Sequence, residues 1–121
     1  MKYVVFTTKH HDGFGLFGSK AGNYNAGAVL RRDLAQEIVE AARAEGLRVG
    51  FYHSVIDWHH DQYAYQRSKQ LPHPLHGKPY PNDKRDHAKY VEYLHGQVRE
   101  REIHQSLAGV TSAPVRSTIR R

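Results

Sequence analysis

The stretch TTKHHDGF, residues 7–14, decides how the rest of the chain is interpreted. It follows KYVVF, whose β-branched and aromatic residues predict a buried strand over Tyr3 to Thr8 that is apolar on both faces. Because successive side chains of a strand point to opposite faces, His10 and His11 cannot share a face while the strand stays regular. They must lie where the strand ends. Titratable groups at the carboxyl end of a strand are typical of ligand sites in α/β enzymes.

A helix and a second strand are predicted next. After a long glycine-rich loop over residues 9–32, Asp33 caps a helix together with Gln36, and Gly46 ends it where a left-handed residue is needed. The expected apolar face of this helix consists of Leu34, Ala35, Ile38, Ala41 and Ala42. LRVGFYH, residues 47–53, predicts the second strand. Strand, helix and strand in this order predict a parallel pair with a right-handed crossover.

The second half of the chain predicts a loop, a helix and a tail. The loop over residues 54–83 begins at the carboxyl end of the second strand, so both long loops open on one edge of the sheet. A helix is expected from residue 84 to about 102, capped by Asn82 or Asp83. Its apolar positions are Tyr90, Val91, Leu94 and Val98. Residues 101–121 are small, polar and basic, which predicts a disordered tail. Two strands leave both sheet edges open, so the chain is expected to be a slice of a larger α/β fold.

Composition limits the classes of protein to which the chain can belong. The 121 residues contain no cysteine, which excludes disulfides and thiolate metal sites but assigns no compartment. No apolar run approaches the roughly 20 residues of a membrane span, and the hydrophobic part of MKYVVFTTKHH is too short for a signal peptide. The sequence therefore predicts one soluble domain without membrane association and leaves its localisation unknown.

The net charge of +6 makes nucleic-acid binding a class to consider, so the distribution of charge matters. Residues 1–100 carry 14 Lys and Arg against 11 Asp and Glu, whereas residues 101–121 carry four against one. Half of the excess therefore lies in the tail. The body has no basic stripe interleaved with aromatic residues, and we expect no nucleic-acid partner.

The first candidate constellation is His10, His11 and Asp12 at the end of the first strand. These groups can hold sugar hydroxyls, orient a carboxylate or bind a metal. The alternative is a hydrogen-bonded loop with one histidine buried for structural reasons. Adjacent histidines diverge, whereas common metal sites space their ligands so that two nitrogens converge on one ion, so a metal is disfavoured.

The second constellation begins at Tyr52 and His53, where the second strand ends, and continues through Asp57 and Trp58. An aromatic platform beside hydrogen-bonding groups suits carbohydrate, whose apolar ring faces stack on aromatic rings. The alternative is a packed loop in which Trp58 and Tyr63 fill the rim of the fold.

Other chemistries have less support. Neither a nucleophile elbow nor a phosphate-binding glycine motif is present, so the glycines of HDGFGLFGSKAG indicate loop flexibility. The pairs Asp57 with Asp61 and Asp83 with Asp86 have the residue types of glycosidase carboxylates, but capping and solvation explain them better.

Several segments in combination resemble the α-L-fucosidases of glycoside hydrolase family 29. They are KYVVFTTKHHDGFGLFGSK, the YN at residues 24–25, RRDLAQEIVEAARAEGLRVGFYHSVIDWHH and, less sharply, DHAKYVEYLHGQVRE. The resemblance covers roughly residues 1–100, and the order and spacing of the segments make the set specific although each piece alone is modest.

The resemblance implies that residues 1–100 are part of a catalytic (β/α)₈ barrel. In that family the two histidines contact fucose hydroxyls and a tyrosine contacts the sugar, so His10, His11 and Tyr52 are expected to bind substrate and Trp58 to line the pocket. The implied reaction is retaining hydrolysis of terminal α-L-fucose from glycoconjugates, with a fucosylated glycan or L-fucose as ligand and no cofactor or metal. Members of the family are often exported or lysosomal.

The resemblance also predicts two carboxyl groups, a nucleophile and an acid/base. The nucleophile is expected on an apolar strand after GQVRE, where this chain reads REIHQSLAGVTSAPVRSTIRR without an aspartate. We therefore assign no catalytic residue and expect this chain to be inactive alone, as a gene fragment or a frameshifted reading frame would be.

Two rival interpretations stay open at this point. A metal-dependent hydrolase of another barrel family would use His10, His11 and His53 as ligands. A non-enzymatic interaction module would use the basic tail over residues 101–121, and its binding would be sensitive to salt.

Overall fold

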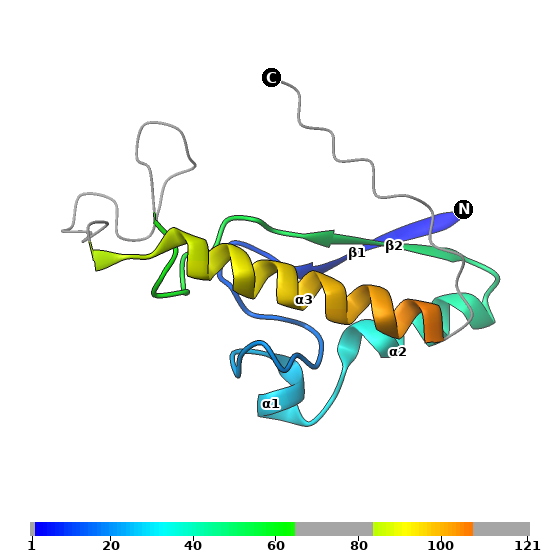
Figure 1. Ribbon diagram of the computed structural model, residues 1–121. Coiled ribbons are helices and arrows are strands. Elements are labelled where there is room, and N and C mark those ends of the chain that lie inside the picture. The colour runs from blue at the N-terminus through cyan, green and yellow to red at the C-terminus, as the bar shows by residue number, and fades with distance from the viewer. Residues whose placement is uncertain (1, 65–83, 108–121) are drawn as a thin grey trace, which may run out of the picture.

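The computed structural model describes residues 2–64 and 84–107 of the chain. Two strands and three helices follow one another within these ranges (Figure 1). In chain order they are β1 (Tyr3–Lys9), α1 (Ala26–Leu30), α2 (Leu34–Ala44), β2 (Arg48–His53) and α3 (His87–Leu107). Among the described residues, no helix is both long enough and apolar enough to cross a membrane.

The two strands form a parallel pair, as the sequence predicts. Their register runs from Tyr3 beside Arg48 to Lys9 beside His53, with an irregularity between Thr7 and Lys9. Both carboxyl ends therefore lie together, where the two arrows point to the left near the middle of Figure 1, and α2 and α3 run along the sheet. The loops that follow β1 and β2 consequently start from the same edge.

The predicted start and end of α2 are confirmed. The Asp33 side chain accepts a hydrogen bond from the backbone N–H of Gln36 at 2.9 Å, which satisfies a free donor of the first turn. After the helix, Gly46 adopts φ +68°, the left-handed conformation that glycine reaches without strain.

The buried face of α2 differs from the predicted one. Ala35, Val39 and Ala42 are buried, whereas Ile38 is 38% exposed and Ala41 is exposed. Because α2 contacts both strands, its small alanines face the sheet and let the helix approach closely. The bulkiest side chains of the predicted apolar face, Leu34 and Ile38, lie at the margin of the buried face.

Burial of the sheet on both faces was also predicted, and the described residues cover only one face. Val4 and Phe6 are half-buried on the covered side, whereas Tyr3 and Val5 on the opposite side are 64% and 58% exposed. The alternation of the strand explains the split, since neighbouring residues point to opposite faces.

The segment over residues 9–32 contains more structure than the predicted loop. The short helix α1 lies within it, and the side chain of Asn25, 1% exposed, caps that helix by accepting from the N–H of Ala28 at 3.0 Å. Gly15 also forms isolated bridges with Lys9 and Asn25. The segment is thus held to the end of β1 by backbone pairing.

The last helix begins and ends later than predicted. Asp86, directly before α3, accepts from the N–H of Ala88 at 3.1 Å, and the helix continues to Leu107 instead of ending near residue 102. The expected caps Asn82 and Asp83 lie outside the described residues, as do most of the predicted second loop and residues 108–121 of the predicted tail. On α3, Tyr90 packs with Tyr63 in a small core.

Candidate functional site

Four side chains singled out by the sequence lie together at the carboxyl ends of the two strands. The ring centroids of Tyr52 and His10 are 6.1 Å apart, those of His10 and His11 are 4.1 Å apart, and those of His11 and Trp58 are 5.3 Å apart. We call this set, Tyr52, His10, His11 and Trp58, the aromatic row. It joins the loop after β1 to the end of β2 and the loop that follows.

The row runs from solvent into the protein. His10 is exposed and Tyr52 is 44% exposed, whereas His11 is only 8% exposed and Trp58 is half-buried. Both histidines follow the last residue of β1, in the turn where the strand has ended. A ligand can therefore reach one end of the row from solvent while the other end is fixed by its surroundings.

Hydrogen bonding determines the tautomer of His11. Its Nδ1 lies 2.6 Å from Ser54 Oγ, and that hydroxyl donates its single proton to the carbonyl of Ile56 at 2.8 Å. Nδ1 must then carry a hydrogen and donate to Ser54, which leaves Nε2 as an acceptor. Burial, with a smaller effect of His10, lowers the pKa of His11 below its ordinary value. The neutral ring can thus accept a hydrogen bond from a ligand hydroxyl.

A buried ion pair lies beside the row. The Nζ of Lys9 is 3.0 Å from Oδ2 of Asp57, and these side chains are 0% and 1% exposed. The other carboxylate oxygen accepts from the backbone N–H groups of His59 at 3.0 Å and His60 at 2.8 Å. Burial lowers the pKa of Lys9, and the adjacent carboxylate opposes that shift.

Sequence reasoning missed this pair. The predicted capping role of Asp57 is confirmed by the two amides, but its predicted solvation is wrong because burial and Lys9 replace water around it. The available signal was a lysine at the end of an apolar strand, which needs a carboxylate partner when buried. No local sequence pattern indicates that two residues 48 positions apart form an ion pair.

His53 lies behind the row and is directed inward. Thr8 Oγ1 donates to the carbonyl of Tyr52 and lies 3.0 Å from Nδ1 of His53, whose ring also contacts Phe17. Burial, with a contribution from Lys9, lowers the pKa of His53 to about 4. Among the residues described, no three His, Cys, Asp or Glu side chains form a group suited to a metal ion.

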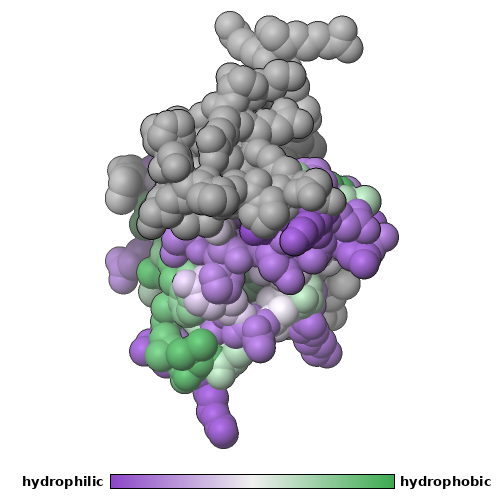
Figure 2. Space-filling model, turned by 90° about the vertical axis from the view of Figure 1, so that its left-hand side faces the viewer, coloured by the Kyte–Doolittle hydropathy of each residue, from purple (hydrophilic) through white to green (hydrophobic). Residues whose placement is uncertain are grey.

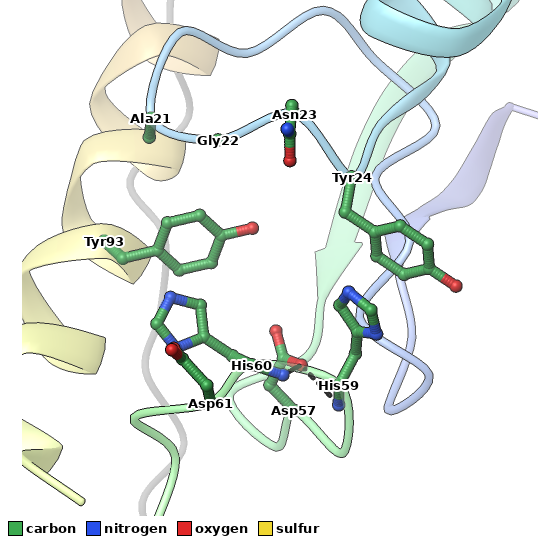
Figure 3. Close-up of a pocket in the computed structure, with 9 residues that line it drawn as sticks. All are labelled: Ala21, Gly22, Asn23, Tyr24, Asp57, His59, His60, Asp61 and Tyr93. Atoms are coloured by element: carbon green, nitrogen blue, oxygen red, sulfur yellow. Dashed lines mark hydrogen bonds and ion pairs between the residues drawn. The ribbon is translucent and has the colours of Figure 1, made fainter.

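A separate cavity of about 230 Å³ opens beside the ion pair (Figure 3). Tyr24 and Tyr93 stand at opposite sides of it, and Asp57, His59 and His60 lie between them. Residues 21–24 and Asp61 complete its lining. The ring of His59 stacks on Tyr24 at 3.7 Å. No member of the aromatic row lines this cavity, so the two features are distinct.

The side of the molecule seen in Figure 2 is mainly hydrophilic where the described residues form its surface. Hydrophobic atoms gather toward the bottom of that view, at the level of α1 in Figure 1. On α1, Val29 and Leu30 are 64% and 52% exposed. These two side chains give α1 an exposed apolar surface.

The family assignment rests on comparison with known proteins. A family model described as alpha-L-fucosidase matches residues 1–104. The chain belongs to the α-L-fucosidase family. Human tissue alpha-L-fucosidase is 45% identical over 64 residues, which are 51% of this chain and 14% of that protein.

Solved α-L-fucosidase structures show the same arrangement. Alpha-L-fucosidase isoenzyme 1 from Paenibacillus thiaminolyticus is 47% identical, with a TM-score of 0.68 over 84% of this chain and 24% of that one. A family 29 enzyme from Bacteroides thetaiotaomicron, solved as a trapped covalent intermediate with 2-fluoro-fucosyl fluoride, is 34% identical, with a TM-score of 0.66 over 85% of this chain and 21% of that one. The chain therefore spans less than a quarter of the length of each of these relatives.

Membership of the α-L-fucosidase family does not favour the rival interpretations. The segments that carry the predicted resemblance fall inside the matched range. A metal-dependent hydrolase would need converging ligands, and His53 points into the protein, away from the exposed His10. An interaction module based on the tail would leave the match over residues 1–104 unexplained.

Proposed function

We propose that the aromatic row binds the fucose ring in an α-L-fucosidase active site. The observation that carries this proposal is the contiguous row of Tyr52, His10, His11 and Trp58 at the carboxyl ends of two parallel strands. In (β/α)₈ barrels, ligands bind at that end of the strands. We further propose that residues 1–100 are part of such a barrel, because their two parallel strands and returning helices have its repeating order.

The row offers both kinds of contact that a sugar needs. Nε2 of His11 can accept from a hydroxyl, and the exposed ring of His10 adds a donor or acceptor at the solvent end. The half-buried indole of Trp58 and the ring of Tyr52 supply faces on which the apolar side of a sugar can stack. This combination favours a neutral sugar over an anion or a metal ion.

The proposed reaction is retaining hydrolysis of a terminal α-L-fucose from a glycoconjugate. A retaining glycosidase needs two carboxyl groups about 5 Å apart, one of which attacks the sugar. The carboxylate of Asp57 is only 1% exposed and is held by Lys9 and two backbone amides, so it is not placed to attack a sugar on the aromatic row. We therefore propose that the described residues supply sugar binding and not the nucleophile.

A ligand titration tests the binding proposal. L-fucose added to the full chain should change the fluorescence of Trp58, the single tryptophan, with a saturable curve, whereas D-fucose should bind at least about tenfold more weakly. His11→Ala should weaken L-fucose at least about tenfold, since it removes the fixed acceptor and leaves Ser54 without its partner. His95→Ala, which changes an exposed histidine of α3, is the matched control. Equal binding of both enantiomers, or no effect of His11→Ala, would refute the proposal.

An activity assay tests the division of roles. The purified chain should release no aryl group from an aryl α-L-fucoside above the background rate. Turnover that His11→Ala abolishes would overturn the statement that the nucleophile is not supplied by this chain, while supporting the sugar site itself.

A further inference from the structure

We infer that Lys9 and Asp57 are positioning residues that fix His11 and Trp58 relative to one another for the sugar. This inference rests on the proposed function and adds to it two residues that are set apart from the aromatic row. Neither side chain belongs to the aromatic row, and both are almost completely buried, at 0% and 1% exposed, with Asp57 lining the separate cavity beside the ion pair. Their influence must therefore pass through the groups that they hold.

The ion pair joins the two segments that carry the row. Lys9 is the last residue of β1, and Asp57 lies in the loop after β2. His11 follows Lys9 by two positions, and Trp58 directly follows Asp57. Across the same junction, the backbone N–H of Trp58 donates to the carbonyl of His11 at 2.7 Å. The pair and this hydrogen bond thus hold the same two segments at neighbouring points.

Gly13, in the turn that carries His11, is closely packed against the loop that carries Asp57. Gly13 has φ +82°, and a Cβ there would lie closer to Oδ1 of Asp57 and to Cβ of His59 than any van der Waals contact allows. The HHDGF turn therefore lies directly against the Asp57 carboxylate. A change in the position of that carboxylate would displace the turn that carries His11.

The backbone of Lys9 also supports His11. Its carbonyl accepts from the N–H of Ser54 at 2.9 Å, and the hydroxyl of Ser54 is the partner of His11 Nδ1. The Nζ of Lys9 additionally lies 3.4 Å from Oη of Tyr90, which itself donates to the carbonyl of Val55. The lysine is therefore the point at which β1, the loop after β2 and α3 meet.

The Lys9–Asp57 ion pair orients the two segments through its charge and its hydrogen bonds, and not only by filling space. A buried ion pair contributes little net stability compared with apolar side chains of the same volume, but it is directional. Asp57 uses both oxygens: one binds Lys9, and the other accepts from the amides of His59 and His60, which lie beside it in Figure 3. An uncharged pair of similar shape should therefore fold, while the orientation of the row becomes less defined.

The test compares the unmodified chain with a double variant that combines Lys9→Met and Asp57→Asn. The substitution Asp57→Asn keeps a side-chain oxygen for the amides of His59 and His60, and the double change removes both buried charges together. Without ligand, nuclear Overhauser contacts between the His11 and Trp58 rings should weaken, and the amide signal of Trp58 should shift. The affinity for L-fucose should fall at least about tenfold.

Two control variants separate positioning from general stability. Arg32→Gln breaks the exposed ion pair with Glu37 and should change none of these readouts. Arg101→Met breaks the partly buried pair with Asp33 and should lower the urea midpoint, while the Trp58 signal and the fucose affinity stay as in the unmodified chain. If the double variant does not fold, Lys9→Gln combined with Asp57→Asn, which also removes both charges and keeps polar groups at both positions, is measured in the same way.

The ligand-free measurement keeps this inference distinct from the proposed function. Loss of the contacts between His11 and Trp58 supports positioning even if the unmodified chain binds no L-fucose, a result that would refute the proposed function alone. Unchanged contacts and an unchanged Trp58 amide in the folded variant would overturn the positioning role, whatever the sugar affinity.

Discussion

The two ends of the same pair of strands are built in opposite ways. At the carboxyl ends, the polar residues Thr8 and Lys9 are 1% and 0% exposed, whereas toward the amino end of β1, on the face that the described residues leave uncovered, the apolar residues Tyr3 and Val5 are 64% and 58% exposed. Stability alone favours the reverse, with apolar groups inside and charges in water. The buried pair of Lys9 and Asp57 fixes the geometry of the end that carries the aromatic row.

The largest effect on stability is expected from a substitution at the buried carboxyl ends of the strands. Asp57→Ala leaves the Lys9 ammonium buried without its carboxylate, which should lower the free energy of unfolding by about 3–5 kcal/mol. Val5→Ala at the other end should cost about 1 kcal/mol or less, because the side chain already meets solvent. Urea denaturation measures both. Equal losses for the two variants would contradict the contrast between the ends.

The free energy of unfolding should also depend on pH, because His53 is half-buried at the carboxyl end of β2. Its pKa is lowered to about 4 in the folded chain, whereas an unfolded histidine titrates near 6.5. Below about pH 6.5 the unfolded chain binds the proton first, so stability is complete above that pH and is lost as pH falls toward 4. The loss at about pH 5 should be about 2 kcal/mol from this group.

The matched variants for the pH series are His53→Gln and His95→Gln. The first should flatten the acid slope of the unfolding free energy, leaving a smaller slope from His11 and His60, whose pKa values are also lowered by burial. The second changes an exposed histidine and should leave the slope as it is. An unaltered slope in His53→Gln would refute the assignment.

A smaller effect is expected at the start of α2. Asp33→Ala removes the cap to Gln36 and also the hydrogen bond from Gly18 and the ion pair with Arg101. The free energy of unfolding should fall by about 1–2 kcal/mol, toward the upper end of cap substitutions. Asp33→Asn keeps a capping oxygen and should recover about half of the loss, which urea denaturation at neutral pH resolves. A full loss in the asparagine variant would mean that the charge, not the cap, matters.

The smallest effect is expected at the exposed amino end. Tyr3→Thr keeps a residue that favours strands and should change the free energy of unfolding by less than about 0.5 kcal/mol. Its affinity for L-fucose should stay within about twofold, because the site is at the opposite end of β1. A tenfold change in that affinity would show that the two ends are coupled.

The sequence predicted those elements whose signals are local. The cap at Asp33 and the left-handed Gly46 are properties of one turn each, and the strands follow from short apolar runs. The helix α1 was missed because five residues in a glycine-rich segment have no periodic pattern. Its cap, Asn25, has a capping residue type, but no apolar repeat follows it.

The sequence predicted the residues of the aromatic row but not the buried ion pair that lies beside them. The order of the elements placed His10, His11, Tyr52 and Trp58 near one edge of the sheet, and the structure brings their rings into one row. The pairing of Lys9 with Asp57 depends on two segments meeting in space. Local patterns carry no information on such a contact.

Whether the aromatic row is the sugar site is tested most directly by a nuclear magnetic resonance titration of the full chain with L-fucose. The largest shifts should fall on the imidazole signals of His10 and His11, the ring of Tyr52 and the indole of Trp58, with small changes at Tyr3 and Val5. Shifts confined to the cavity lined by Tyr24 and Tyr93, or the absence of any saturable shift, would contradict the assignment of the aromatic row as the sugar site.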